Sequence, residues 1–197
     1  MRALLFLVAA TAACTPDIVS GSYLCGPEQA CPEGLACNGT DNICVLPGAA
    51  EPFSCGTVTE TEGNDSAQTA QPLGDGIACS TPRLEVIACA AADDPQDLYR
   101  FDVPASCASA NVQLGLTFPL AFAVLEAELQ DANGGVIATA GSCAGEDPDD
   151  AVDNRCLRSP VTPGMRYHVR VAPSGEGTCD GACAYNRYTL NLQVTSP

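Results

Sequence analysis

The chain contains no lysine, and its eight basic residues, all arginine, face 24 acidic ones, so the formal net charge is -16. A surface this acidic repels nucleic acid and anionic lipid headgroups, which excludes the function classes that depend on a basic face. Cations are the small partners that such a surface attracts. No nucleic-acid partner is therefore expected.

Catalytic groups are equally scarce, because the chain has a single histidine, His168. Neither the His-Glu-x-x-His motif of zinc hydrolases nor the Gly-x-Ser-x-Gly motif of serine hydrolases occurs. The spacing of the many carboxylates singles out no pair suited to glycoside hydrolysis. We expect His168 to be an outward or packing residue of a strand, and the protein to have no catalytic residues, no enzymatic activity and no organic cofactor.

Long apolar runs are absent after the N-terminus, where residues 1–13 form a leader too short to span a bilayer. Arg2 supplies a positive charge, residues 3–10 are apolar and residues 11–13 are small. Cys14 follows directly, and this order resembles the lipobox of bacterial lipoproteins. The resemblance implies cleavage before Cys14, lipidation of its thiol and a lipid anchor at the outer membrane or cell surface. The alternative is an ordinary secretory signal, with Cys14 in a disulfide.

The chain has 13 cysteines, an odd number for an exported protein. Lipidation of Cys14 would leave twelve cysteines, which can all pair. Disulfides in this number require an oxidising compartment, the periplasm or the cell exterior.

Residues 14–24 are expected to form a tether, and residues 25–47 a small disulfide module. Cys25, Cys31, Cys37 and Cys44 are separated by five, five and six residues. A segment this short cannot hold a core without covalent or metal staples. Its Cys-Pro-x-Gly-x-x-Cys stretch resembles small knots of the EGF or Dickkopf type. Zinc is the competing use, but no Cys-x2-Cys pair occurs and the compartment is oxidising.

Residues 48–57 are a linker rich in proline, glycine and alanine, and residues 58–197 are predicted to form a β domain. Alternating or β-branched segments predict strands at residues 84–89, 98–103, 112–118, 136–139, 167–171 and 188–194. Residues 121–130 contain good helix formers, but their alternation predicts a strand, with a hairpin turn around Asn133 and Gly134. The expected fold is mostly β, an antiparallel, jelly-roll-like sandwich.

Four segments of this β domain carry a family resemblance: EGNDSAQTAQPL at 62–73, DDPQDLYRF at 93–101, LQDANGGVIATA at 129–140, and YHVRV with a terminal YTLNLQV. In order and spacing they resemble the bacterial pre-peptidase C-terminal domain, which includes collagen-binding segments of secreted collagenases. The resemblance implies a non-catalytic β-sandwich of an exported protein.

The family's calcium-binding members use two acidic segments that are both present here. One holds Glu60, Glu62, Asn64 and Asp65, and the other holds Asp94 and Asp97 at the turn before the next strand. Calcium takes six to eight oxygen ligands, and an extended backbone would place Glu60, Glu62 and Asn64 on one side. The alternative is a solvated acidic linker whose Asn-Asp-Ser segment caps a short helical turn.

The β domain contains eight cysteines, which sequence alone can pair in 105 ways: Cys55, Cys79, Cys89, Cys107, Cys143, Cys156, Cys179 and Cys183. If cysteines that are close in sequence pair with each other, the pairs are Cys79 with Cys89, Cys143 with Cys156 and Cys179 with Cys183. Cys55 then remains for Cys107. The acidic run at 146–154 lacks the EF-hand register and is interpreted as a solvated loop closed by a disulfide.

Together these features predict a membrane-anchored, non-catalytic lipoprotein whose calcium-stabilised sandwich binds an extracellular or periplasmic protein or glycan. The alternatives are an inhibitor or accessory subunit of a secreted peptidase, and a purely structural envelope component.

Overall fold

The protein is built almost entirely of β-strands. A computed structural model describes residues 20, 23, 25–38, 43–48, 59–74, 78–80, 82–91, 96–119, 124–145, 152–174 and 185–196. Within these residues, none of the helical structure is long and apolar enough to cross a bilayer.

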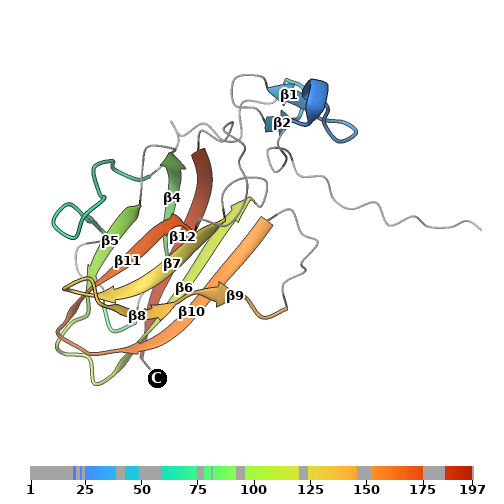
Figure 1. Cartoon of the computed structure of the whole chain (residues 1–197). Coiled ribbons are helices and arrows are strands. Elements are labelled where there is room, and N and C mark those ends of the chain that lie inside the picture. The colour runs from blue at the N-terminus through green and yellow to red at the C-terminus, as the bar shows by residue number, and fades with distance from the viewer. Residues whose placement is uncertain are drawn as a thin grey trace, which may run out of the picture.

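Two five-stranded sheets pack face to face and form the β-sandwich (Figure 1). The first sheet has the order β4 (Leu84–Ala91), β12 (Tyr185–Thr195), β6 (Ala110–Pro119), β10 (Val152–Val161) and β9 (Gly141–Ser142). The second has the order β3 (Gln71–Pro72), β5 (Asp97–Asp102), β11 (Arg166–Pro173), β7 (Leu125–Asp131) and β8 (Val136–Thr139). All pairs are antiparallel except β3 with β5. The predicted mostly β, antiparallel sandwich is confirmed.

The core lies between the two sheets and follows the alternation of the sequence. On β12, Leu190, Leu192 and Val194 are at most 1% exposed, and the residues between them face outward. On β5, Phe101 is buried, whereas Asp102 beside it is exposed. Each fully buried large side chain stabilises the fold by about 1.5–3 kcal/mol.

The segments expected to be strands all form strands, including the ambiguous one, of which residues 125–131 form β7. Alternate burial along β7, with Leu125, Ala127 and Leu129 inward, outweighs the helix propensity of its residues. The predicted hairpin joins β7 to β8, and Gly134 takes a φ of 83° in its turn. Asp131 Oδ1 accepts hydrogen bonds from the backbone N–H groups of Asn133 and Gly135.

One long strand was not expected. Val152–Val161 forms β10 in the first sheet, so the interpretation of residues 146–154 as a solvated loop is wrong for residues 152–154. The apolar pattern is hidden because Asp153 and Ser159 occupy buried positions, the former paired with Arg155 at 2.5 Å. Residues 146–150 lie outside the described residues.

The disulfides of the sandwich agree only in part with the predicted pairing of cysteines that are close in sequence. Cys143 bonds to Cys156, the predicted pair. Cys79 bonds to Cys107, so the pairings of Cys79 with Cys89 and of Cys55 with Cys107 are wrong. Cys89 also forms a disulfide. Cys79 and Cys107 are 28 residues apart in sequence, but the fold brings them together. Distance along the sequence therefore does not predict this bond.

Cys14, Cys55, Cys179 and Cys183 lie outside the described residues, so the predicted pair of Cys179 with Cys183 is not described.

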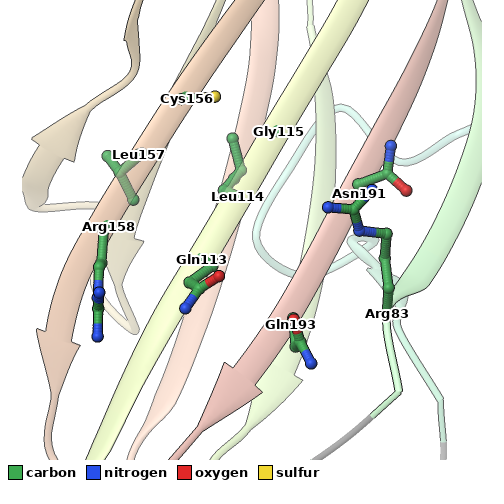
Figure 2. Close-up of a pocket in the computed structure, with 9 residues that line it drawn as sticks. All are labelled: Arg83, Gln113, Leu114, Gly115, Cys156, Leu157, Arg158, Asn191 and Gln193. Carbon is green, nitrogen blue, oxygen red and sulfur yellow. The ribbon is translucent and has the colours of Figure 1, made fainter. Parts of the chain in front are cut away.

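The outward face of the first sheet is polar and contains a hollow of about 330 Å³ (Figure 2). Its lining comes from β6, β10 and β12 and from the residue before β4. We call it the outer-face hollow, and its residues are Arg83, Gln113, Leu114, Gly115, Cys156, Leu157, Arg158, Asn191 and Gln193.

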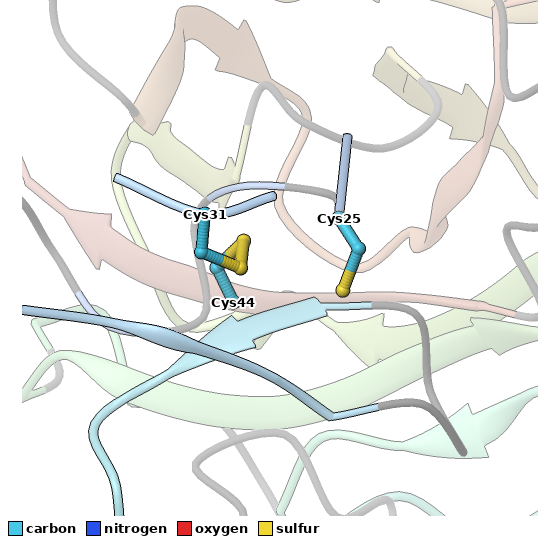
Figure 3. A group of neighbouring side chains, drawn as sticks. All are labelled: Cys25, Cys31 and Cys44. Atoms are coloured by element: carbon cyan, nitrogen blue, oxygen red, sulfur yellow. A yellow bond between two sulfur atoms is a disulfide. The ribbon is translucent and has the colours of Figure 1, made fainter. Parts of the chain in front are cut away.

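The N-terminal knot contains a short 3-10 turn, η1 (Pro27–Gln29), and a hairpin of β1 (Ala36–Asn38) with β2 (Ile43–Val45). Its two disulfides interleave, because Cys25 bonds to Cys37 and Cys31 bonds to Cys44. The sulfur atoms of Cys25, Cys31 and Cys44 lie within 4.8 Å of one another (Figure 3). Disulfide sulfurs are not thiolates, so this group is a covalent staple and not a zinc site.

Candidate metal centre

Five side chains from three parts of the sandwich meet in a buried group, which we call the acid–tyrosine cluster: Glu60, Asn64, Asp97, Tyr99 and Tyr188. Asn64, Asp97 and Tyr99 are fully buried, and Tyr188 is 1% exposed. Glu60 Oε1 accepts a hydrogen bond from Asn64 Nδ2 at 3.0 Å and one from the Tyr99 hydroxyl at 2.5 Å. The Tyr188 hydroxyl donates to Asp97 Oδ2 at 2.6 Å.

The two sheets and the segment before β3 place these groups. Asp97 and Tyr99 are two residues apart on β5, so they share its inward face. Tyr188 reaches them from β12, which belongs to the opposite sheet. Glu60 is held at the edge of β4, because its Oε2 accepts the backbone N–H of Cys89 at 3.2 Å.

The oxygen atoms of the cluster are one hydrogen short. Three contacts join Glu60 Oε1, the Tyr99 hydroxyl, the Tyr188 hydroxyl and Asp97 Oδ2 in a row, at 2.5, 2.6 and 2.6 Å. Each contact needs one hydrogen, and the two hydroxyls supply one each. The third must come from a protonated carboxyl, or a cation lying against the carboxylate oxygens must take its place.

Burial keeps both tyrosines protonated. It is the largest cause that raises the pKa of Tyr99 far above its ordinary value, and the negative charges of Asp97 and Glu60 raise this pKa further. Burial likewise raises the pKa of Tyr188, assisted by Tyr99 and by Asp97. The two hydroxyls therefore act as neutral hydrogen-bond donors between two carboxyl groups.

Three of the six residues predicted to bind calcium belong to the cluster: Glu60, Asn64 and Asp97. Asp97 is the first residue of β5 and is fully buried, although it was expected at the turn. Asp94 lies outside the described residues. Glu62 and Asp65 are exposed.

The expected extended alternation of Glu60, Glu62 and Asn64 is wrong. Gly63 takes a φ of 90°, which turns the backbone between Glu62 and Asn64. After the bend, the Asn64 carbonyl accepts the N–H of Leu98 at 3.0 Å, so the segment pairs with the start of β5.

The alternative of a capped helical turn describes the next residues in part. The N–H of Thr69 donates to the Ser66 carbonyl at 3.0 Å, which closes a single turn. The two side-chain oxygens of Ser66 and Thr69 lie 2.8 Å apart. No helix follows within the described residues 59–74.

The donor types of the cluster fit calcium. Two carboxylates and an amide oxygen are hard oxygen ligands, and the side chains of the cluster contribute no sulfur ligand. Asn64 Oδ1 is buried and accepts no hydrogen bond from a described group. A buried acceptor in this state costs about 1–3 kcal/mol, which a bound cation would recover.

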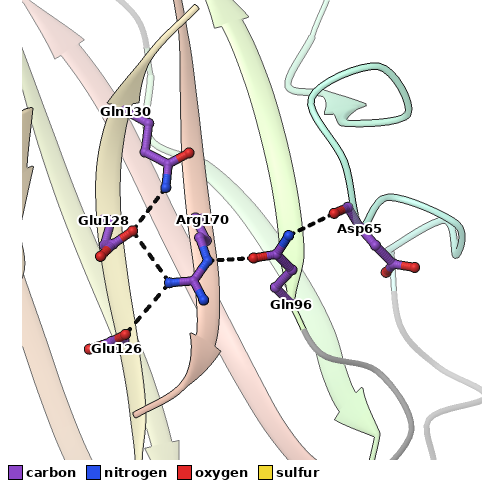
Figure 4. A network of polar contacts seen from close by, with 6 residues as sticks. All are labelled: Asp65, Gln96, Glu126, Glu128, Gln130 and Arg170. Atoms are coloured by element: carbon purple, nitrogen blue, oxygen red, sulfur yellow. Dashed lines mark hydrogen bonds and ion pairs between the residues drawn. The ribbon is translucent and has the colours of Figure 1, made fainter. Parts of the chain in front are cut away.

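The exposed side of the same region is fixed by a polar network around Arg170 of β11 (Figure 4). Arg170 donates to Gln96 Oε1 at 2.5 Å and to Glu128 Oε2 at 3.3 Å. Gln96 Nε2 in turn donates to the Asp65 carbonyl at 2.7 Å. The residue before Asp97 is thereby tied both to the acidic segment and to β11.

On β11, His168 points away from the core between the two sheets, but its side chain is still only 2% exposed. This is the packing position that was expected for it. Its Nδ1 lies 3.3 Å from the Asp131 carbonyl oxygen. Among the described residues no cysteine, serine or carboxylate forms a hydrogen bond with its ring, so no nucleophile–base pair is present there.

The two tyrosines of the cluster were missed as site residues. A signal was available, because Tyr99 lies two residues after Asp97 on an alternating strand. The partner Tyr188 could not be found in this way, since it is 89 residues further along the chain.

Comparisons with known proteins find similarity in solved structures only. No family model matches the chain, and no curated protein matches it. The pre-peptidase C-terminal domain of a collagenase from Bacillus anthracis is similar with a TM-score of 0.42 and 16% identity, over 62% of this chain and 93% of that domain. A periplasmic inhibitor of g-type lysozyme from Aeromonas hydrophila, PliG, is similar with a TM-score of 0.35 and 9% identity, over 64% and 96%. At these scores neither likeness assigns a family, ligand or activity to the chain.

Proposed function

We propose that this protein is an exported, non-catalytic binding module, held at a membrane by lipid on Cys14 and stabilised by calcium in the acid–tyrosine cluster. In this proposal the sandwich binds a protein or glycan outside the cytoplasm, and the N-terminal knot, of the EGF or Dickkopf type, serves as a spacer.

The missing hydrogen of the cluster is the observation that carries the calcium proposal. When both carboxyl groups are ionised, the row of two carboxylates and two hydroxyls lacks one of the three hydrogens that its contacts need, and a bound cation would supply the missing positive charge. The buried Asn64 Oδ1 accepts no hydrogen bond from a described group and could also bind that cation. Calcium would be held by Glu60, Asn64 and Asp97, with its other ligands from outside this set. When bound, it would supply a fixed positive charge that joins the entry segment to β5.

Export is supported by the disulfides, because four are fully described and the sandwich carries two of them. Such bonds persist outside the reducing cytosol. Mass spectrometry of the purified mature protein tests the anchor, and an unmodified Cys14 at or near the N-terminus would overturn it.

The calcium proposal is tested by thermal unfolding of the full mature chain in calcium, in magnesium and in EDTA. Calcium at a hundredfold excess over its Kd stabilises the folded state by about 2.7 kcal/mol, or about 5–10 °C in Tm. Magnesium should give a smaller shift, because it keeps its waters and demands octahedral geometry. Equal midpoints in millimolar calcium and in EDTA would refute the site.

Two variants locate the effect. Asp97→Asn keeps the size of the side chain and an acceptor for Tyr188, but removes a charged calcium ligand, so the calcium shift should be largely lost. Glu85→Gln removes an exposed carboxylate of β4 outside the cluster, so the shift should remain. An unchanged shift in Asp97→Asn would place the metal elsewhere.

A further inference from the structure

The outer-face hollow is formed by two rows of outward residues that run across the first sheet. In one row, Arg158 of β10 lies opposite Gln113 of β6, which lies opposite Gln193 of β12. In the next row, Gly115 of β6 lies between Cys156 and Asn191. Because glycine has no side chain, the surface of the sheet is recessed at Gly115. A Cβ at that position would meet only Asn191 Cβ, at 3.9 Å.

Two guanidinium groups flank the hollow. Arg83 stands on the β4 side and Arg158 on the β10 side, with the amides of Gln113 and Gln193 between them (Figure 2). Strands in a sheet are about 4.8 Å apart, so three spacings separate β10 from β4 by about 14 Å. The hollow therefore presents two separated cations with hydrogen-bonding amides between them.

Within the part of the chain that the structure describes, neither arginine forms an ion pair. The ion pairs among the described residues involve Arg155, Arg166 and Arg170, and none involves Arg83 or Arg158. Among the described residues that line the hollow there is no carboxylate. The nearest carboxylate in the strand pairing is Glu85, opposite Asn191, and it lines a different hollow. In a chain of net charge -16, this is a local concentration of positive charge.

We propose that the outer-face hollow binds an acidic oligosaccharide that carries carboxylates on more than one of its sugar units. Arg83 and Arg158 bind the carboxylates, and the amides of Gln113, Asn191 and Gln193 bind the hydroxyls. The inference rests on the proposed function of a binding module, and it is independent of calcium.

The side chains around the hollow favour a glycan over a peptide. Protein interfaces concentrate their binding energy in buried aromatic and large apolar anchors. The described residues that line this hollow include no aromatic side chain, and the two leucines among them lie at strand positions that face the core. Planar amides and guanidinium groups instead match the hydroxyls and carboxylates of an acidic sugar. The volume of about 330 Å³ is at the lower end of the ~300–1,000 Å³ of small-molecule sites.

Binding is measured by calorimetry with the full mature chain and three probes: oligogalacturonate, the same oligomer methyl-esterified on its carboxylates, and oligoglutamate of equal charge. The titrations are made in EDTA, because uronates also chelate calcium, and a thermal melt in the same buffer confirms that the chain is folded. Oligogalacturonate should bind, with an affinity that falls as salt rises. The ester and oligoglutamate should bind at least tenfold more weakly.

Three variants assign the binding to the hollow. Arg83→Gln and Arg158→Gln should each weaken binding about tenfold or more, since each removes a charge-assisted hydrogen bond. Gly115→Val keeps both arginines, places a side chain on the floor of the hollow and suits a strand, so it should weaken binding about tenfold or more without loss of stability. Arg166→Gln is the control, because it removes an exposed arginine from β11 of the other sheet and should leave binding unchanged.

Each contrary result overturns the proposal. No binding of oligogalacturonate refutes the ligand, and equal binding of the ester refutes recognition of the carboxylates. Equal or tighter binding of oligoglutamate refutes the choice of a glycan. Normal binding by Gly115→Val moves the ligand to another surface. A failed calcium melt with intact binding would refute only the calcium part of the proposed function, so the two failures are distinguishable.

Discussion

The buried tyrosines of the acid–tyrosine cluster should make the protein sensitive to alkali in a way that can be calculated. In the unfolded chain, Tyr99 and Tyr188 ionise near pH 10. In the folded chain their pKa values are raised, chiefly by burial, so they keep their protons. Their contribution to stability is therefore fully present below pH 10 and is lost as the pH rises above it.

The magnitude follows from linkage. Above pH 10 the folded state holds up to two more protons than the unfolded state, so the free energy of unfolding falls by up to about 2.7 kcal/mol per pH unit. Integrated from pH 9 to pH 11, the loss is also about 2.7 kcal/mol, half from each tyrosine. The chain has no lysine, and arginine does not titrate in this range, so few other side chains obscure the effect.

The assay is urea unfolding at pH 9, 10 and 11, with tyrosinate absorbance recorded in the same samples. Wild type should lose about 2.7 kcal/mol between pH 9 and pH 11, and its absorbance should rise together with unfolding. Tyr188→Phe should lose only about half of that, although it is less stable at pH 9 because Asp97 loses its donor. Tyr99→Phe provides the same test if that variant is too unstable.

Two results would refute this reasoning. One is an identical pH dependence in wild type and both phenylalanine variants, which would show that neither hydroxyl is linked to folding. The other is ionisation of all tyrosines at pH 10–11 in a chain that is still folded. Either result would mean that water reaches the cluster.

Two further predictions concern the backbone and the covalent staples. Replacement of Cys143 and Cys156 by serine should lower the free energy of unfolding by about 3 kcal/mol, because the bond closes a loop of 13 residues; an unchanged urea midpoint would show that the loop is ordered without it. Gly63→Ala should cost about 1–2 kcal/mol, since a φ of 90° strains any residue with a Cβ although no atom lies within 4 Å of that position. Gly141→Ala, where the space is also open and φ is not positive, is its control and should be nearly neutral in thermal melts.

The positions of most strands could be predicted because burial in a sandwich imposes alternation on each strand separately. Leu125, Ala127 and Leu129 face the core, so their spacing predicts β7 despite helix-forming residues. β10 escaped prediction because a buried aspartate, Asp153, which pairs with Arg155, and a buried serine, Ser159, replace apolar residues at its inward positions. A paired charge can be buried, but a pattern of hydrophobicity does not show it.

The candidate site was predictable only in part. The acidic segment and Asp97 were found from their residue types and their family resemblance, and the structure brings Glu60, Asn64 and Asp97 to one place. Tyr188 was not found, because nothing near it in sequence marks its partner. The exposed position of Glu62 depends on the backbone bend at Gly63, which glycine permits but does not require.

The sequence by itself determined that this chain forms an acidic β-sandwich with a stapled N-terminal knot. Those properties follow from composition, from cysteine density and from a period of two residues, all of which are local. Only the tertiary structure decided which strands are neighbours, and with that the bond from Cys79 to Cys107, the meeting of Tyr99 with Tyr188, and the row from Arg158 to Gln193. The physical reason is that alternation states which face of a strand is buried, whereas strand order depends on how the whole chain closes its core.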